Sequence, residues 1–515
     1  MNISQDKKQN YLWKILCILW YVTIFAAVFR EYLFKISLPF GGHLFLFRLL
    51  LPVVTVLYLV WAFKYKYNPF KEMTKTEWSF VILAGVMLCY GTLSAFFAFE
   101  LGAWFSKFTT IAYALIFVEL YLLFSRDKAV RRITLTVFLC ALLICLVGGF
   151  LECFTDAFFE TPYAGETRYV FFGKKLYAPI FCFYNTNGFV ATLVFGLAIG
   201  AVYLAENWNI LKKRYAKLCM ILITGVLAVT YFLIRAGSAR LGYISFLILL
   251  GCYVIWLCFR SRRSLLLLIP LVLFIGFVHV GENYEAIRAE WQIGTNTEPE
   301  VNEEQNTPPE DVIPAPPQND MPDVPEQEPE EETDTSVPPE EEAPLVNVVA
   351  PITTLQESDH VRWSLIKNGL DMLLDSGFLG VGVGNGEIML AGYQNTMGIT
   401  NFHCFIVEVM AEFGLFAILP ALVLVFLCFR AWIIRLICLI RQKNGAAFAD
   451  LFVMVGSVLM FPFLSMANSS SWGLMAMWLY LAFVLHATLG IQRKSPPPPA
   501  EVLESGEQQK PEKDI

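Results

Sequence analysis

Residues able to do chemistry gather in one stretch of this chain, between Arg362 and Gly414. The stretch holds an arginine at Arg362, a glycine-rich run at 380–384 and a histidine at His403. A guanidinium grips phosphate through paired hydrogen bonds, glycine lets backbone approach a ligand closely, and imidazole titrates near neutral pH. This combination suits a phosphate-bearing substrate, with His403 as a base or an electrostatic group.

A second pair of cations, Arg235 and Arg240, flanks a short turn between two apolar segments. Arginines at the ends of membrane spans often extend toward lipid headgroups, and Arg362 has the same simple explanation. Two arginines in one tight turn, on the face where positive charge is disfavoured, nevertheless favour a phosphate site. We prefer Arg240 to Arg235 as its ligand.

Further candidates for binding substrate are Glu408, Asn187, Lys174 and Lys175. Glu408 and Glu412 have the i, i+4 spacing of one helical face, and carboxylates so close to hydrocarbon usually face a cavity or a partner. Asn187 lies beside Asn185 where an apolar helix begins, and a helix cap is the simpler interpretation there. The two lysines lie in a polar connection at 153–184.

No motif indicates a metal or a nucleotide. The run 380–384 lacks the G-x-G-x-x-G spacing and follows no strand, and the sequence has no HExxH or Cys-x-x-Cys. The twelve cysteines lie mostly in apolar segments, so we expect no metal and no cofactor. A Cys153–Cys182 bridge stays open because the two cysteines bracket one connection.

The composition is that of a membrane protein. The chain has 515 residues, of which 56% are hydrophobic and 16% charged, against about 25% charged in soluble domains. Apolar runs of about 20 residues, enough to cross about 30 Å of hydrocarbon, recur along it. We therefore predict an all-α polytopic membrane protein. Its twelve spans fall near 11–30, 43–63, 78–98, 104–124, 132–152, 185–205, 217–235, 240–259, 264–281, 411–431, 449–467 and 471–490.

Basic residues predict the orientation of these spans. They cluster at 7–8, 64–75, 126–132, 212–217, 260–263, 435–443 and 493–494. All of these segments share one side when the spans alternate, and such a bias marks the cytoplasmic side. Both termini are then cytoplasmic, and the connections at 153–184 and 282–410 face outward.

One inserted segment contains many of the acidic residues of the chain. Between Glu298 and Glu342 there are 17 Asp or Glu and no Lys or Arg, so the rest of a chain of net charge −7 is basic. We predict a membrane domain at 1–281, a large outer loop at 282–410, three more spans within 411–490 and a disordered tail at 491–515. Within the loop, 297–344 is expected to be disordered. An amphipathic helix is expected near 361–375, where Trp363, Leu370 and Leu374 follow helical spacing.

Three segments in this order resemble the O-antigen ligase and Wzy-type polysaccharide polymerase superfamily. They are 187–191 (Asn-Gly-Phe-Val-Ala), 238–242 (Ser-Ala-Arg-Leu-Gly) and the stretch 362–414 described above. The resemblance covers roughly residues 180–430. Two positions depart from the family pattern, which commonly has Asn where Cys404 follows His403 and usually reads Ser-Arg where this hairpin reads Ser-Ala-Arg240.

The resemblance implies a GT-C-like, metal-independent, inverting glycosyltransferase at the outer face of a bacterial cytoplasmic membrane. Its donor would be a glycan on undecaprenyl diphosphate, and its acceptor a glycan, a lipid or a wall polymer. Arg240 and Arg362 would neutralise the departing diphosphate, and His403 would assist the acceptor hydroxyl or orient the diphosphate.

Polymerase and ligase use the same donor chemistry, and the sequence does not separate them. The competing class is a transporter or a lipid-linked glycan flippase, which should show internal repeats or ionisable residues at mid-span. No clear repeat is visible, and the polar residues concentrate at one face. Membrane lipid is an expected partner, and nucleic acid is not.

Overall fold

The computed structural model describes residues 11–29, 32–37, 43–155, 167–183, 185–208, 213–260, 262–295, 355–467 and 471–494. The predicted disorder of 297–344 and of the tail concerns residues almost wholly outside these ranges and stays a prediction. Contacts divide the chain into a main unit, 1–284 with 350–515, and a second unit, 285–349. The second unit contains most of one described helix, α11 (Tyr284–Thr295).

The all-α polytopic fold is confirmed, because eleven helices in the described ranges are long and apolar enough to cross a membrane. They are α2 (Tyr11–Phe29), α3 (Leu46–Lys64), α4 (Lys75–Leu93), α5 (Leu101–Phe124), α6 (Lys128–Glu152), α7 (Thr186–Asn207), α8 (Lys213–Ala236), α9 (Arg240–Arg260), α10 (Leu268–Glu282), α15 (Leu415–Arg441) and the pair α16 (Gly445–Leu459) and α17 (Phe461–Ala467). The twelfth predicted span corresponds to α18 (Met475–Lys494), whose apolar part, Met475–Gly490, is shorter.

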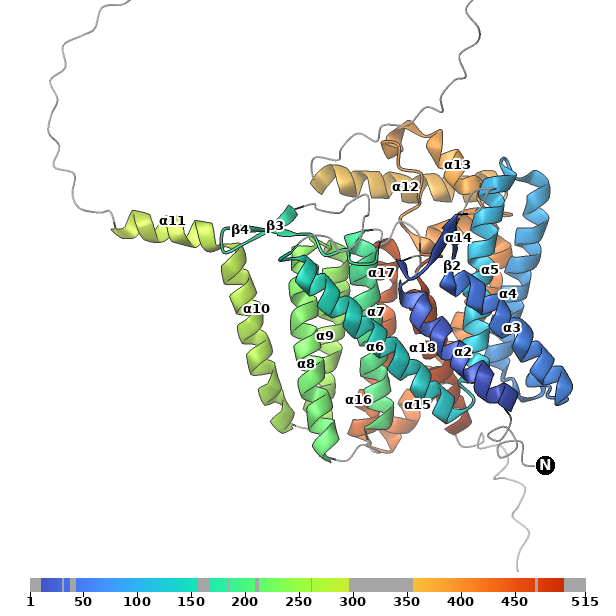
Figure 1. The fold of residues 1–515 in the computed structure, drawn as a ribbon, viewed down its shortest axis with the longest axis horizontal. Coiled ribbons are helices and arrows are strands. Elements are labelled where there is room, and N and C mark those ends of the chain that lie inside the picture. Colours follow the sequence, from blue (N-terminus) through green and yellow to red (C-terminus); the bar gives the residue numbers. More distant parts are fainter. Residues whose placement is uncertain are drawn as a thin grey trace, which may run out of the picture. The chain divides into compact units, whose positions relative to one another are not determined.

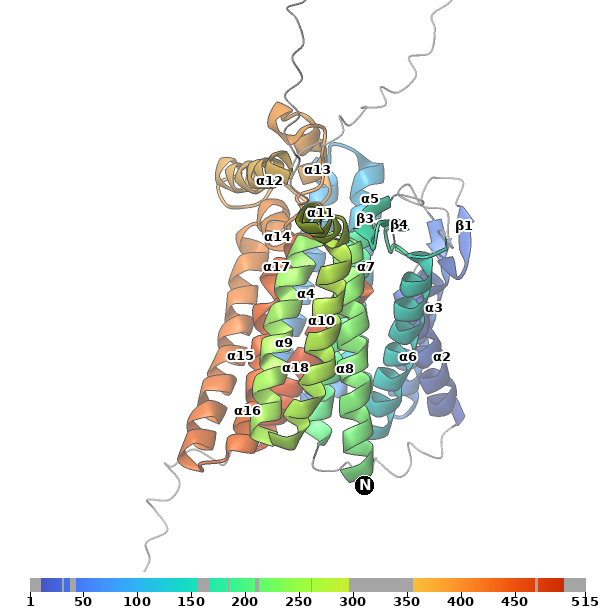
Figure 2. The same cartoon turned by 90° about the vertical axis from the view of Figure 1, so that its left-hand side faces the viewer.

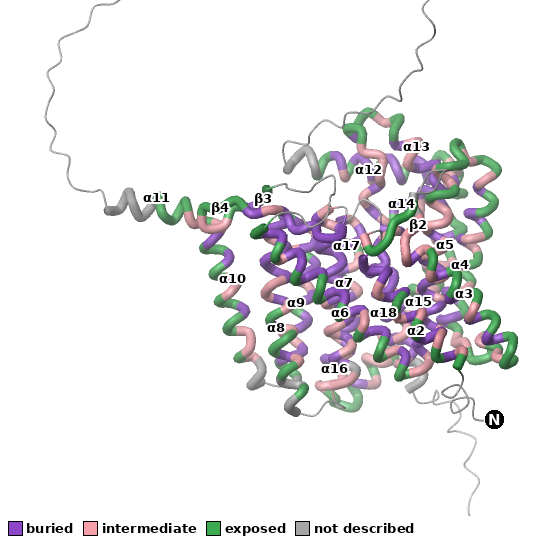
Figure 3. The backbone as a smooth tube through the Cα atoms, viewed as in Figure 1, coloured by how far each residue is buried: buried purple, intermediate pink, exposed green. Residues whose placement is uncertain are grey.

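The spans differ in how much of each is buried inside the protein (Figure 3). In α7, 78% of the span is buried, whereas α10 is 17% and α15 only 11% buried. The exposed side chains of α15 are largely apolar, including Leu422 and Phe426. Soluble proteins do not expose so large an apolar surface to water. The exposed faces of α10 and α15 are therefore suited to contact lipid.

The described strands form two short antiparallel hairpins. One pairs β1 (Lys35–Ser37) with β2 (His43–Phe45), and the other pairs β3 (Thr167–Phe171) with β4 (Lys174–Tyr177). The described cysteines are all unpaired, so the Cys153–Cys182 bridge is not formed. The Cys182 sulfur instead lies 3.9 Å from that of Cys145, and the Cys153 thiol donates to the Gly149 carbonyl.

Residues 355–414, here called the cover segment, lie over one end of the spanning helices (Figures 1 and 2). They form α12 (Leu355–Asp375), α13 (Asn385–Ala391) and α14 (Phe405–Phe413). The buried face of α12 belongs to a small core with α14 and includes Val361, Leu365 and Met372. Trp363, 69% exposed, and the exposed Leu374 form a second apolar surface, as a helix at a membrane interface requires.

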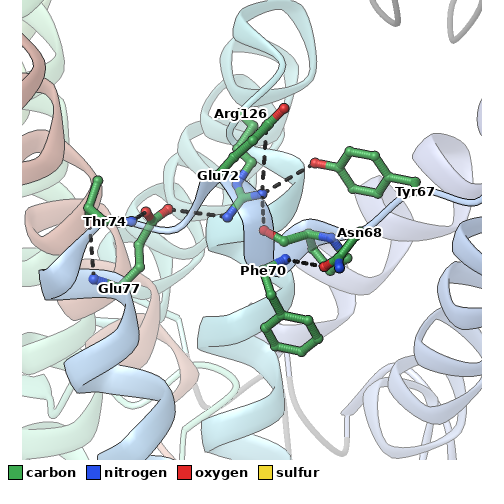
Figure 4. Close-up of polar contacts among 8 residues, drawn as sticks. Tyr67, Asn68, Phe70, Glu72, Thr74, Glu77 and Arg126 are labelled. Carbon is green, nitrogen blue, oxygen red and sulfur yellow. Dashed lines mark hydrogen bonds and ion pairs between the residues drawn. The ribbon is translucent and has the colours of Figure 1, made fainter.

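At the far end of α5 from the cover segment, Arg126 joins two connections (Figure 4). Its Nη1 donates to the Tyr67 hydroxyl at 3.2 Å and to the Pro69 carbonyl at 2.9 Å, and its Nη2 lies 3.5 Å from Glu77 Oε1. Glu77 also completes a reciprocal cap with Thr74 at the start of α4. The network therefore fixes the ends of α3, α4 and α5 relative to one another.

Candidate active site

The glycine-rich run 380–384 packs its backbone against α14. The Val381 amide donates to the Ala411 carbonyl at 2.9 Å, and the three glycines all have φ between 80° and 93°, where other residues are strained. A Cβ on Gly380 would lie 2.6 Å from the Glu412 carbonyl oxygen. The prediction that the run approaches a ligand is therefore wrong for Gly380, whose missing side chain lets it contact α14 instead.

Asn385 then joins the glycine-rich run to the connection between α4 and α5. Its Nδ2 donates to the carbonyls of Val381 at 2.8 Å and Phe97 at 3.1 Å. Its Oδ1 accepts a hydrogen bond from the Phe99 amide at 2.9 Å. The cover segment is thus attached to the spanning helices through backbone groups on both sides.

Three predicted catalytic residues, Arg240, Arg362 and His403, come together in this frame, and we call them the cationic cluster. Arg240 begins α9, and its Nη1 lies 2.9 Å from Asp359 Oδ2, one turn before Arg362 on α12. Burial lowers the pKa of Arg362, and the charge of Arg240 lowers it further. Burial and then the charge of Arg362 lower the pKa of His403 to about 4, so its imidazole is neutral at physiological pH.

The cationic cluster has unused hydrogen-bonding capacity. Among the described residues, Arg362 makes no hydrogen bond or ion pair, and Nδ1 of His403 is buried without a partner. His403 also has a φ of 48°, an uncommon conformation that is enriched at functional sites. Two arginines held close together repel each other, and within the described ranges only Arg240 has a carboxylate partner, Asp359. The arrangement is therefore suited to a ligand with more than one negative charge.

Arg235 does not belong to the cationic cluster. Its Nε and Nη2 pair with the two carboxylate oxygens of Glu282, at 2.6 and 2.9 Å. The Tyr169 hydroxyl donates to the same carboxylate at 2.8 Å. This guanidinium is occupied within the protein, which distinguishes it from Arg240.

The other polar candidates lie elsewhere. Asn185 caps α7, its Oδ1 accepting from the Gly188 amide at 2.8 Å, and Asn187 lies in the first turn of that helix. Lys174 and Lys175 are exposed on β4. No interaction described for these residues links them to the cationic cluster, so their role in binding substrate stays a prediction.

A buried charge cluster that the sequence analysis missed lies behind α14. Lys107 of α5 forms ion pairs with Glu408, with Glu387 of α13 at 2.6 Å and with Glu412 at 3.8 Å. Glu408, a predicted substrate ligand, is buried here against Lys107. The sequence signal was weak, because a single lysine seven residues into an apolar helix also fits a side chain reaching toward the interface.

This charge cluster contains more carboxylates than cations. Glu412 is fully buried; its Oε1 accepts from the Gly384 amide at 3.1 Å, and its Oε2 has no partner among the described residues. Burial, together with the neighbouring Glu408, raises the pKa of Glu412 to about 8 against the opposing effect of Lys107. Glu412 is therefore mostly protonated at neutral pH, which reduces the excess negative charge.

Residues 225–422 match the O-antigen ligase family. The match begins in α8, includes the cationic cluster and the cover segment, and ends in α15. It confirms the resemblance to the O-antigen ligase superfamily. The eleven apolar helices of the described residues make the chain a multi-pass membrane protein, and the match over 225–422 suggests an enzyme that transfers glycosyl groups in surface polysaccharide biosynthesis. No curated protein and no solved structure matches the chain.

Replacing Lys107 by Met should destabilise the protein strongly. The change leaves buried carboxylates without their cation, and removing one partner of a buried ion pair costs about 3–5 kcal/mol. The apparent melting temperature in detergent should fall well below that of Lys367→Met, a matched change at an exposed position of α12. Adding Glu408→Gln should recover part of the loss, and equal melting of the two single variants would contradict the role of Lys107.

The raised pKa of Glu412 predicts a pH dependence of stability. A carboxyl whose pKa rises from 4.5 to about 8 on folding contributes stability that is fully present below pH 4.5 and is lost as pH rises through 8. Glu412→Gln should therefore weaken the fall in melting temperature between pH 7 and about 9. Asp375→Asn, at an exposed carboxyl, is the control, and an unchanged slope in Glu412→Gln would refute the assignment.

Proposed function

We propose that this protein transfers glycans from undecaprenyl diphosphate to an acceptor hydroxyl at the outer face of the bacterial cytoplasmic membrane. The observation that carries the proposal is the unpartnered guanidinium of Arg362, held beside Arg240 and the neutral His403 within the family-matched region. A diphosphate supplies the negative charges that such a site lacks. The donor itself provides the free energy of transfer.

The reaction would be a direct displacement at the anomeric carbon. The acceptor oxygen forms the new bond as the bond from that carbon to the diphosphate breaks, which inverts the configuration. Arg240 and Arg362 stabilise the charge that develops on the leaving diphosphate. No step assigned to the protein requires a metal.

His403 would take the proton of the acceptor hydroxyl. Its low pKa in the empty site keeps the imidazole in the neutral form that a base requires. The charge of an incoming diphosphate offsets that of Arg362, so it raises the basicity of the imidazole when the donor is bound. The base is thus strengthened only when the substrate is present.

The placement of the cationic cluster supports an outward-facing site. The cover segment lies at one end of the spans. The basic connections at 64–75, 126–132 and 435–443 follow the opposite ends of those spans, where α3, α5 and α15 finish. Under the positive-inside rule these connections would be cytoplasmic and the cationic cluster would lie outside, which supports the proposal.

Alanine at Arg362, Arg240 or His403 should each reduce transfer by about a hundredfold or more, as expected when one group that stabilises developing charge is lost. Lys367→Ala, on the exposed side of α12, is the matched control. The assay is complementation of a deletion strain, with surface glycans and lipid-linked precursors resolved by gel. Normal glycan in all three variants would refute the proposed function.

The same gels separate the two kinds of transfer. Single lipid-linked units that accumulate without long chains would indicate a polymerase. Long lipid-linked chains that never reach an acceptor would indicate a ligase. Both patterns support the proposed donor chemistry, and they differ only in the acceptor.

Asp359→Asn should lower the KM for the donor. In the empty site the Asp359 carboxylate pairs with Arg240, so it competes with the diphosphate. Because both side chains are substantially exposed, the pair is weak, and KM should fall by about two- to fivefold. Kinetics on purified protein would show this, and a higher KM would mean that Asp359 positions Arg240 for the donor.

A further inference from the structure

An apolar groove of about 710 Å³ lies between α6, α7 and α8, away from the cationic cluster. Most of its wall is aliphatic, with Leu139 and Leu142 from α6 facing Leu193 and Leu197 from α7. Gly200 keeps one part of the groove wide, because a Cβ there would first meet Leu139 at 3.8 Å. Hydrocarbon rather than water is the suitable filling for such a surface.

The polar residues of the groove wall lie mainly at one end. Arg132 is in the first turns of α6, Asn207 ends α7, and Tyr215 begins α8. Arg132 is exposed, so its guanidinium is available to a ligand at the mouth of the groove. A cation and a phenol at the mouth of an apolar groove are complementary to a phosphate that carries an apolar tail.

The length of the groove fits a lipid tail. From Arg132 to Leu146 the wall of α6 rises about 21 Å, at about 1.5 Å per residue. One leaflet accounts for about half of a hydrocarbon core about 30 Å thick. The groove therefore accommodates the full depth of an acyl chain from the leaflet at the Arg132 end.

This site is distinct from the one proposed for the glycan donor. Along α8, Tyr215 and Arg235 are twenty residues apart, which is about 30 Å of helix, and Arg240 follows Arg235 in the next turn of chain. A phosphate bound at Arg132 is thus on the opposite side of the membrane from the cationic cluster. A donor whose diphosphate occupies the cationic cluster cannot also place it at Arg132.

We propose that the groove between α6, α7 and α8 binds one anionic phospholipid, with its phosphate at Arg132 and Tyr215 and an acyl chain along the leucines. The lipid completes the packing of three helices that otherwise leave a gap. This proposal does not depend on the glycosyltransferase activity. It concerns the leaflet on the side of the basic connections.

Native mass spectrometry of the full chain, purified in mild detergent, tests this directly. Phosphatidylglycerol, phosphatidylcholine and undecaprenyl phosphate are added separately at equal concentration. One phosphatidylglycerol per chain should bind in preference to phosphatidylcholine. Arg132→Ala, which removes the phosphate contact, and Gly200→Leu, which fills the groove, should each reduce its occupancy by about tenfold.

Two matched variants control for charge and for bulk. Lys128→Ala removes an exposed cation of α6 outside the groove wall, and Gly225→Leu adds a side chain to α8 where nothing lies within 4 Å. Both should bind phosphatidylglycerol as the wild type does. Three results would each overturn the proposal. They are an equal loss of phosphatidylglycerol binding in Lys128→Ala, no binding of phosphatidylglycerol to the wild type, and preferential binding of undecaprenyl phosphate. A melting temperature raised by phosphatidylglycerol in the wild type but not in Gly200→Leu would support it.

Discussion

The backbone contact between the glycine-rich run and α14 positions the rest of the candidate site. Gly380 lies so close to α14 that a side chain there would overlap its backbone, and the Gly382 amide donates to the Glu412 carbonyl at 3.0 Å. The run follows directly after α12, which carries Arg362, and α14 follows directly after His403. This contact, together with the side-chain packing of α12 on α14, therefore holds the helix that carries Arg362 against the helix that follows His403.

Opposite charges lie on either side of this frame. His403 of the cationic cluster precedes α14, whose first turn adds positive potential. The carboxylates of Glu408 and Glu412 lie within the helix, against Lys107. Because Lys107 and the proton on Glu412 neutralise most of that buried charge, little of it is left to weaken the cationic cluster. The charge behind α14 is thus largely neutralised within the protein, whereas in the cationic cluster only Arg240 has a carboxylate partner in the part of the chain that the structure describes, Asp359.

Sequence patterns were sufficient for the spans, because twenty-residue apolar runs leave few alternatives. The resemblance to a family, rather than their spacing, selected Arg240, Arg362 and His403, which are far apart in the chain. Sequence patterns favoured Arg240 over Arg235 but did not show the reason, since the partner that occupies Arg235 is Glu282, 47 residues away on another helix. They also predicted a ligand next to the glycine-rich run where Gly380 contacts α14, because close approach by a ligand and by a helix backbone both require a residue without a side chain. The ion pairs of Lys107 were not predicted, because its three acidic partners come from distant segments and lie close to it only in the folded chain.

Cys404 departs from the pattern of the O-antigen ligase superfamily, and this departure changes how the start of α14 is capped. It occupies the N-cap position of α14, where its side chain makes no capping hydrogen bond. The asparagine common in the family would accept a hydrogen bond from a first-turn amide and stabilise the helix by about 1 kcal/mol, whereas a thiol is a weak acceptor. In this chain the amides of Ile406 and Val407 meet only the weakly accepting sulfur of Cys404, so they keep more of their hydrogen-bonding capacity. His403 directly precedes this N-cap residue, so the positive potential at the start of α14 lies next to it in the chain.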